Sequence, residues 1–282
     1  MAGQVFAYIT HKQGKADDTA AELAKAAGKI FPGAAVTAIV TGTGAETDAV
    51  CNEAAAFYQE VWKFDNEALA YPNAEAIRPL LVNVLPQDAV VFLGHDTFGM
   101  DLAPGLAIKI DSVFVSDVVD FEGLDGETLK VIRQEYSGQV STHINCDISA
   151  GAIISVRPGA FQPDETGSAG GQVIDKSADC GDLTVGRRFL EVVEAEAGDV
   201  DITKEDVLVS VGRGIEDEDN LEIADELAEA IGAVVSCSRP IVDAKWLEKS
   251  RQVGTSGQTV KPKVYLALGI SGSFQHMGGL KG

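Results

Sequence analysis

The 282-residue sequence lacks the features of membrane, secreted and nucleic-acid-binding proteins. No apolar run reaches the roughly 18 residues typical of a membrane-spanning helix. The N-terminal MAGQVFAYIT has neither the basic stretch nor the cleavage site of a signal peptide. The sequence has 22 Lys and Arg residues but 43 Asp and Glu residues. The resulting net charge of −21 repels nucleic acid and anionic lipid. We therefore expect a cytoplasmic globular protein with no membrane insertion and no nucleic-acid partner.

Cysteine and histidine are also sparse. The four cysteines, Cys51, Cys146, Cys180 and Cys237, show no C-x-x-C spacing, so zinc and iron–sulfur sites are not expected. In a reducing compartment such isolated cysteines are most simply small buried residues. The four histidines are equally dispersed, so we predict no metal site. No Ser-His-Asp arrangement and no pair of catalytic carboxylates is evident.

The first half of the sequence alternates between strand-like and helix-like segments. Apolar runs and helical spacing predict strands at 4–10, 34–42, 60–65 and 88–94, and helices at 17–30, 47–58, 74–86 and 101–110. Thr47 is expected to cap the second helix, and Pro104 to lie in the first turn of the fourth. This alternation predicts an α/β domain with a parallel sheet covered on both faces.

The pattern changes after about residue 113. Short β-rich runs at 112–123, 128–138, 139–146 and 151–161 predict a β-rich extension of the first domain. Residues 162–182 are polar and rich in Gly, Ser and Asp, which predicts an exposed connection. We place the first domain at 1–187 and the second at 188–282.

The second domain again alternates strands and helices. We predict strands at 206–214, 233–240 and 264–269, the last of them buried, and a helix at 220–233. The apolar face of that helix is expected to contain Leu221, Ala224, Leu227, Ala228 and Ile231. Asp219 or Asn220 would cap it.

Four turns of the second domain follow or adjoin these strands, and each combines small residues with a polar or charged one. They are Val211-Gly212-Arg213-Gly214, Ser236-Cys237-Ser238-Arg239-Pro240, Gln252-Val253-Gly254-Thr255-Ser256-Gly257 and Gly269-Ile270-Ser271-Gly272-Ser273-Phe274-Gln275-His276. Ligands of open α/β sheets bind at the carboxyl ends of the strands, so we expect the turns to converge there. Taken singly, each also has an ordinary interpretation as a turn, a surface ion pair, a flexible loop or a structural histidine.

Together and in this order, the four turns resemble the FAD-binding domain of electron transfer flavoprotein alpha subunits, the FixB family. That family shows Gly-Arg-Gly, Ser-Arg, Gln-Val-Gly-Gln-Thr-Gly and Gly-Ile-Ser-Gly-Ala-Ile-Gln-His in succession. The stretches DLAPGLAIKI, SDVVDF, RQEYSGQVSTHI and VRPGAFQP are similar to the family's N-terminal domain. The resemblance implies a nucleotide-hydrolase-like N-terminal domain that contacts a beta subunit, followed by a Rossmann-like FAD-binding domain.

The resemblance also implies a set of cofactor-binding residues. They are Arg213, Ser238, Arg239, Gln252, Val253, Gly254, Thr255, Ser256, Gly269, Ser271, Gly272, Ser273, Gln275 and His276. By this resemblance the Ser256 hydroxyl approaches flavin N5, Arg239 lies over the isoalloxazine ring, and His276 faces the C2 carbonyl and N1. A fixed cation over the ring favours the anionic reduced flavin and raises its reduction potential.

Other positions are implied to contact the rest of FAD, and some depart from the family pattern. Ser271, Gly272 and the amides after them would hold the pyrophosphate, and Arg213 would brace the phosphate or ribityl region. Thr255 replaces a family glutamine, which changes a contact near the ring. Gln258 stands where the family often has lysine, so one charge is missing.

By resemblance the chain is an electron carrier rather than an enzyme with its own substrate. It would pair with a beta subunit and shuttle electrons from an acyl-CoA dehydrogenase or a similar flavin dehydrogenase to an acceptor, with electron bifurcation left open. The family continues past the position of Gly282 with strands that contact adenosine, so we expect a truncated second domain.

Two other functions are open to this sequence. A non-redox adenine-nucleotide-binding subunit is one alternative, although phosphate binding alone needs none of Arg239, Ser256 and His276. An NAD(P)-dependent enzyme is disfavoured because no Gly-x-Gly-x-x-Gly follows the first strand of either domain.

Overall fold

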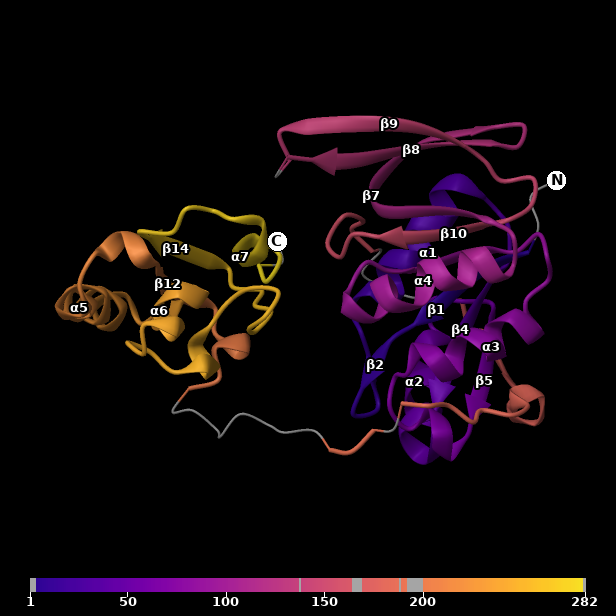
Figure 1. The fold of residues 1–282 in the computed structure, drawn as a ribbon, viewed down its shortest axis with the longest axis horizontal. Coiled ribbons are helices and arrows are strands. Elements are labelled where there is room, and N and C mark those ends of the chain that lie inside the picture. Colours follow the sequence, from indigo (N-terminus) through magenta and orange to yellow (C-terminus); the bar gives the residue numbers. More distant parts are fainter. Residues whose placement is uncertain (1–3, 137, 164–168, 188, 192–199, 281–282) are drawn as a thin grey trace. The chain divides into compact units, whose positions relative to one another are not determined.

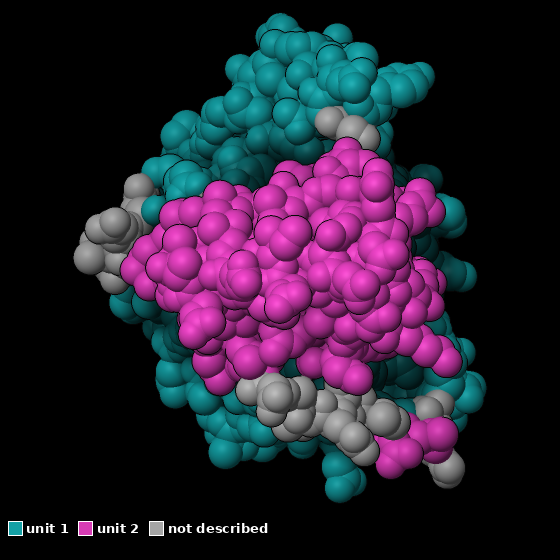
Figure 2. Space-filling view, turned by 90° about the vertical axis from the view of Figure 1, so that its left-hand side faces the viewer, with its two compact units in different colours: residues 1–189 teal, residues 190–282 magenta. Residues whose placement is uncertain are grey.

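The chain folds into two compact units, Met1–Phe189 and Leu190–Gly282, which Figure 2 colours separately. The computed structural model describes residues 4–136, 138–163, 169–187, 189–191 and 200–280. Each unit has apolar clusters of its own on both faces of its main sheet. Among the described residues, every helix is too short or too polar to cross a membrane.

The first unit is built around a nine-stranded sheet with the order β11-β5-β4-β1-β6-β10-β7-β8-β9 (Figure 1). The strands are β1 (Val5–Ile9), β4 (Val36–Gly42), β5 (Glu60–Asp65), β6 (Val90–Gly94), β7 (Val113–Asp125), β8 (Thr128–Glu135), β9 (Val140–Asp147), β10 (Ala152–Val156) and β11 (Gln172–Asp175). Neighbours from β11 to β7 pair in parallel, and β8 and β9 add an antiparallel ribbon. A small hairpin, β2 (His11–Lys12) and β3 (Lys15–Ala16), follows β1.

Four helices cover the two faces of this sheet: α1 (Thr19–Ile30), α2 (Gly44–Ala54), α3 (Ala74–Val84) and α4 (Thr97–Lys109). Side chains of α1 and α2 share one apolar cluster with alternate residues of the sheet, and α3 and α4 share the opposite cluster. Strands β1 and β6 are buried along their whole length, as apolar strands between two helical layers must be. The predicted parallel sheet covered on both faces is confirmed.

Two predictions about helix ends are wrong. Helix α2 begins at Gly44, whose N–H is accepted by the Asp65 carboxylate at 3.0 Å, so Thr47 lies buried inside the helix rather than at its cap. Helix α4 begins at Thr97, because the Asp96 carboxylate accepts from Gly99 N at 2.6 Å. Pro104 therefore lies in the helix interior and not in its first turn.

Two strands also lie elsewhere than predicted. β10 does not belong to the β-rich extension, because it pairs in parallel with β6 and β7 inside the main sheet. β11 lies in the segment predicted to be an exposed connection and adds to the sheet beside β5. Cys180, shortly after it, is buried, as are the other three cysteines, so the prediction of buried cysteines is confirmed.

The second unit contains a parallel three-stranded sheet with the order β13-β12-β14. Its elements are β12 (Val207–Val211), α5 (Leu221–Ile231), β13 (Val234–Cys237), α6 (Arg239–Asp243), β14 (Val264–Leu268) and α7 (Phe274–Met277). Side chains of α5 and α6 pack on one face of the sheet. Val253, Val260 and Leu280 cover the other face, where Leu208 and Tyr265 lie.

Three details of the second unit differ from prediction. β14 was expected to be buried, but among the described residues it is an edge strand that pairs with β12 alone, and Val264 is 46% exposed. Ile231 is exposed on α5, whereas Ala224 and Ala228 are buried as predicted. Asn220 precedes α5 without a side-chain cap, and its amide instead donates to Ile215 O at 2.7 Å.

Candidate functional site

The four glycine- and serine-containing turns of the second unit meet at the carboxyl edge of its sheet. The first turn bonds to the fourth, because Gly214 N donates to Gly269 O at 2.9 Å. The second bonds to the end of β12, where Ser238 N donates to Val211 O at 2.9 Å. Parallel strands end at the same edge, and these bonds show that the expected convergence occurs.

The third turn is bonded to both the second and the fourth. Val253 N donates to Cys237 O at 2.8 Å, and Thr255 N donates to Gln275 O at 2.8 Å. All four turns thus belong to one hydrogen-bonded array, although residues 212 and 276 are far apart in the sequence. These hydrogen bonds join the four turns that contain the residues predicted to bind the cofactor.

Glycines make this close approach possible. A Cβ atom on Gly212 would lie 2.6 Å from the Gly269 carbonyl oxygen, and one on Gly254 would lie 2.8 Å from the Gln275 carbonyl oxygen. Gly254 also has a φ of +141°, which side-chain-bearing residues rarely adopt. The backbones of the turns therefore touch only because these positions lack side chains.

The fourth turn presents free backbone donors. Within the described chain, the amides of residues 270 to 273 donate to no backbone carbonyl, and Ser271, Gly272 and Ser273 are exposed. Successive free N–H groups in such a turn form a concavity that suits an anion. This is the property that a pyrophosphate would use.

The cationic side chains of the site are exposed. Arg239 is the first residue of α6, and its side chain is 67% exposed, with Nε 3.4 Å from Asp243 Oδ2. Arg213 is exposed and makes no ion pair with any described residue. Both guanidiniums stay charged at any physiological pH and can bind phosphate or a planar anionic group.

The predicted site residues divide into exposed and buried side chains. Those of Arg213, Arg239, Thr255, Ser256, Ser271, Ser273 and Gln275 are exposed, and those of Ser238, Gln252, Val253 and His276 are buried. The amide of Gln252, a residue only 3% exposed, donates to Ser256 Oγ at 2.9 Å. Gln252 therefore orients the exposed serine from inside the unit.

His276 lies inside the second unit, beside Tyr265. The residue is only 5% exposed, and its Nε2 lies 2.7 Å from the Tyr265 hydroxyl oxygen. Burial lowers the pKa of His276, and the nearby Val253 carbonyl opposes this shift. The folded unit thus disfavours the protonated form of this buried imidazole.

Sequence analysis overlooked Tyr265 and two serines beside it. Ser210 of β12 and Ser236 of β13 are directly paired across the sheet and fully buried. Burial raises the pKa of the Tyr265 phenol, and the two serine hydroxyls lower it. The sequence did contain one indication of this polar cluster, because VLVSV and VVSC each have a serine inside an otherwise apolar strand.

The first unit contains a Ser-His-Asp cluster that the sequence did not reveal. His95 Nδ1 lies 3.0 Å from Ser155 Oγ, and His95 Nε2 lies 4.0 Å from Asp117 Oδ1. Ser155 is only 1% exposed, and the Asp117 carboxylate accepts two hydrogen bonds from Arg157, at 2.8 and 2.6 Å. A buried hydroxyl and an aspartate bound to arginine make this cluster structural rather than nucleophilic.

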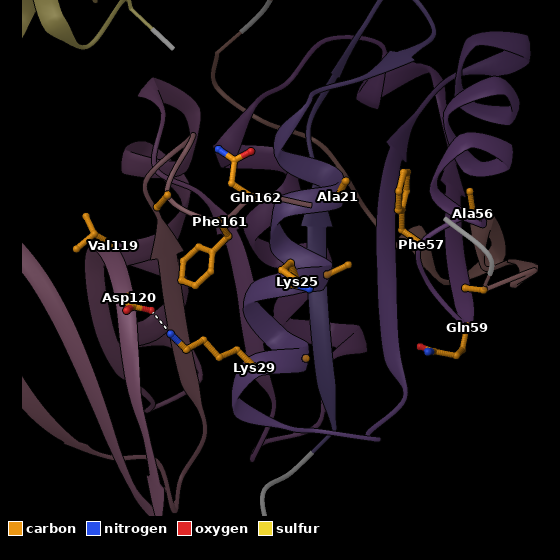
Figure 3. A pocket seen from close by; sticks show the side chains of 14 residues that line it. Ala21, Lys25, Lys29, Ala56, Phe57, Gln59, Val119, Asp120, Phe161 and Gln162 are labelled. Atoms are coloured by element: carbon orange, nitrogen blue, oxygen red, sulfur yellow. Dashed lines mark hydrogen bonds and ion pairs between the residues drawn. The ribbon is translucent and has the colours of Figure 1, made fainter. Parts of the chain in front are cut away.

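The first unit also has a hollow of about 920 Å³ on both sides of α1 (Figure 3). Phe161 and Gln162 lie on one side of the helix, and Phe57 lies on the other. The Lys29 ammonium is paired with the Asp120 carboxylate across part of this hollow. Its described lining contains no serine, threonine, cysteine or histidine, and Lys29 is paired with Asp120, so the four-turn site is the better candidate.

Comparison with known proteins gives two family matches. Residues 5–179 match the electron transfer flavoprotein domain, and residues 201–281 match the electron transfer flavoprotein FAD-binding domain. The second match contains all four turns of the site.

Individual relatives agree with these matches. An electron transfer flavoprotein subunit alpha from Methylophilus methylotrophus is 40% identical over 195 residues, covering 68% of this chain and 60% of that protein. Protein FixB from Clostridium saccharobutylicum is 30% identical over 253 residues, covering 88% and 75%. A probable mitochondrial subunit alpha from Cryptococcus neoformans var. grubii is 31% identical over 287 residues, covering 97% and 79%. The chain thus spans from 60% to 79% of the length of these relatives.

Proposed function

Because this chain belongs to the electron transfer flavoprotein alpha family, we propose that it holds FAD at the four-turn site and carries electrons between a dehydrogenase and an acceptor. The observation that supports this most directly is the hydrogen-bonded array of four turns in the unit that matches the FAD-binding domain. When bound, FAD would supply the redox chemistry.

The residues at the site fit the cofactor. The free amides of 270 to 273 and the exposed Arg213 suit the pyrophosphate. Backbone contacts at Gly212 and Gly254, where a Cβ would collide, leave the turns close enough to surround one ligand. The donor set is thus complementary to an anionic group beside a planar one.

Three side chains are proposed to tune the ring. Arg239 provides a cation that stays charged, and this stabilises negative charge on a reduced flavin. Ser256 donates a hydroxyl hydrogen, because its oxygen already accepts from Gln252. His276 offers a hydrogen-bond donor from the interior.

We propose a beta subunit as the partner of the first unit and a flavin dehydrogenase, such as an acyl-CoA dehydrogenase, as electron donor. The relatives are named as subunits, and one related chain is named as a subunit of an NAD(+),ferredoxin lactate dehydrogenase. The net charge of −21 would speed the encounter with basic surfaces on partners.

Co-expression with a beta-type subunit tests this function. The complex is purified, the released cofactor is quantified per heterodimer, and the flavin spectrum is followed while a dehydrogenase and its substrate are added without oxygen. We expect stoichiometric FAD that becomes reduced. Recovery of an adenine nucleotide without flavin would instead support the non-redox subunit, and a colourless complex without nucleotide would contradict both.

A further inference from the structure

Three buried polar side chains and one half-buried tyrosine form a cluster in the second unit. They are Ser210 of β12, Ser236 of β13, Tyr265 of β14 and His276 of α7. Ser210 and Ser236 are fully buried, and His276 is 5% exposed. The Tyr265 hydroxyl lies 2.7 Å from His276 Nε2, and the two ring centroids are 5.9 Å apart.

The strand register explains why the tyrosine reaches the histidine. Tyr265 is paired with Leu208, which is two residues before Ser210, and Ser210 is paired with Ser236. The side chains of Tyr265, Ser210 and Ser236 therefore point to the same face of the sheet. The phenol is near the hydroxyls of Ser210 and Ser236 and within 2.7 Å of His276 Nε2. Its hydroxyl therefore lies between the strand serines and the imidazole.

The number of hydrogens available in the cluster limits how it can be bonded. A tyrosine hydroxyl has one hydrogen and two lone pairs, and a neutral imidazole has one N–H and one acceptor nitrogen. Neither serine hydroxyl has a hydrogen-bond partner of normal geometry within the described chain, and both lower the pKa of the nearby phenol, as donors to its oxygen do. If they donate to the tyrosine oxygen, its own hydrogen goes to the imidazole.

We propose that Tyr265 is a positioning residue that donates its hydroxyl hydrogen to Nε2 of His276 and thereby keeps the imidazole hydrogen on Nδ1. Nδ1 is buried and has no hydrogen-bond partner of normal geometry among the described residues. The Nδ1–H group is then the one donor that His276 can offer to another acceptor. The Val253 carbonyl, an acceptor near the imidazole, raises the pKa of His276 against the effect of burial.

The consequence for a bound flavin rests on the proposed function. An imidazole whose hydrogen is fixed on Nδ1 presents a donor in a constant direction, whereas a mixture of tautomers would present a donor only part of the time. Tyr265 would thus affect the reduction potential without contacting the cofactor. The tautomer itself is a property of the chain and is measurable with or without FAD.

The test uses the full chain in its complex, with nitrogen-15 only in histidine. Four histidines give a small set of ring signals, and His276→Gln assigns the one of interest. In the unsubstituted protein at neutral pH we expect a protonated Nδ1 and an acceptor Nε2, before and after removal of flavin. In Tyr265→Phe the preference for the Nδ1–H tautomer should fall about tenfold, the value of one buried hydrogen bond.

Tyr136→Phe is the matched control, because Tyr136 lies in the first unit and is 76% exposed. It should leave the His276 signals and the flavin potential unchanged, whereas Tyr265→Phe should lower the potential at equal FAD content.

A protonated Nε2 in the unsubstituted protein would overturn the proposal, and this measurement does not depend on whether the Tyr265 variant folds. So would an unaltered tautomer in a folded Tyr265→Phe protein. If the unsubstituted complex lacks FAD, the proposed function fails, yet the spectrum without flavin still decides the role of Tyr265.

Discussion

The buried amide of Gln252 donates a hydrogen bond to the exposed hydroxyl of Ser256, with Nε2 and Oγ 2.9 Å apart. A hydroxyl that already accepts has its own hydrogen available for a second partner. The relationship joins the interior of the second unit to the surface of the four-turn site. It makes Gln252 a support for the exposed hydroxyl of Ser256.

Ser256→Ala should lower the flavin reduction potential while FAD remains bound. The loss of one neutral hydrogen bond, about 0.5–1.5 kcal/mol, corresponds to about 10–30 mV for a two-electron couple. Ser256→Thr keeps the hydroxyl and should change the potential little. Redox titration of the complex measures both, with Ser141→Ala, an exposed serine of β9, as the control. An equal potential in the Ala and Thr variants would contradict a donor role for the hydroxyl.

Arg239→Ala should lower the potential more than Ser256→Ala, because it removes a full charge beside the ring. Stability should hardly change, since the exposed ion pair with Asp243 is worth about 0–1 kcal/mol. Asp243→Ala is the matched control, as it breaks the same ion pair but keeps the guanidinium. Redox titration and thermal unfolding distinguish the two effects. If both variants shift the potential alike, the guanidinium has no role of its own.

Gly254→Ala should destabilise the second unit by about 1–3 kcal/mol and reduce its FAD content. The added Cβ would approach the Gln275 carbonyl oxygen to 2.8 Å at a φ of +141°. Gly28→Ala is the control, because a Cβ at this position of α1 meets nothing within 4 Å. There the exchange should be neutral or stabilising, since alanine is the better helix former. Unfolding curves and released FAD report the outcome, and a fully stable Gly254→Ala protein would count against the tight contact.

The stability of the second unit should fall as the pH is lowered below about 6.5, the ordinary pKa of histidine. Burial lowers the pKa of His276 in the folded state, so the unfolded chain binds the extra proton first. The loss continues until the pH reaches the folded-state pKa. Thermal unfolding between about pH 7.5 and pH 5.5 should show the slope, before most carboxylates titrate.

His276→Gln should flatten this dependence in the second unit. Burial also lowers the pKa of His95, so the first unit should keep a slope of the same sign in that variant. His143→Gln changes an exposed histidine and serves as the control. If the stability of the second unit instead rises on acidification, the pKa of His276 must be higher in the folded state than in the unfolded chain.

Local patterns were sufficient for much of the fold. The apolar run VVFLG predicts a strand buried on both faces, and β6 is one, because such a run can be satisfied only between two layers. β5 was predicted at its observed limits, Glu60–Asp65. The helix start at Gly44 was missed because its N–H is satisfied by Asp65, a residue on another strand.

The convergence of the four turns could also be predicted from local patterns. The order of the four turns along the chain is visible in the sequence, and parallel strands must bring such turns to one edge. The bonds between them, such as Thr255 N to Gln275 O, depend on the way separate loops pack. The orientation of His276 likewise depends on Tyr265, which the sequence offers only as one more apolar position in a strand.

The sequence by itself determined the alternation of elements, the positions of the glycines and charged residues, and the family, because these follow from local periodicity and motif order. Only the tertiary structure decided that Ser155, His95 and Asp117 meet in a buried cluster and that Ser256 is held by Gln252. It also decided that β14 is an exposed edge and that His276 is bound to Tyr265. Contacts between distant residues depend on strand register and on the packing of layers, and neither is encoded in any short stretch of the chain.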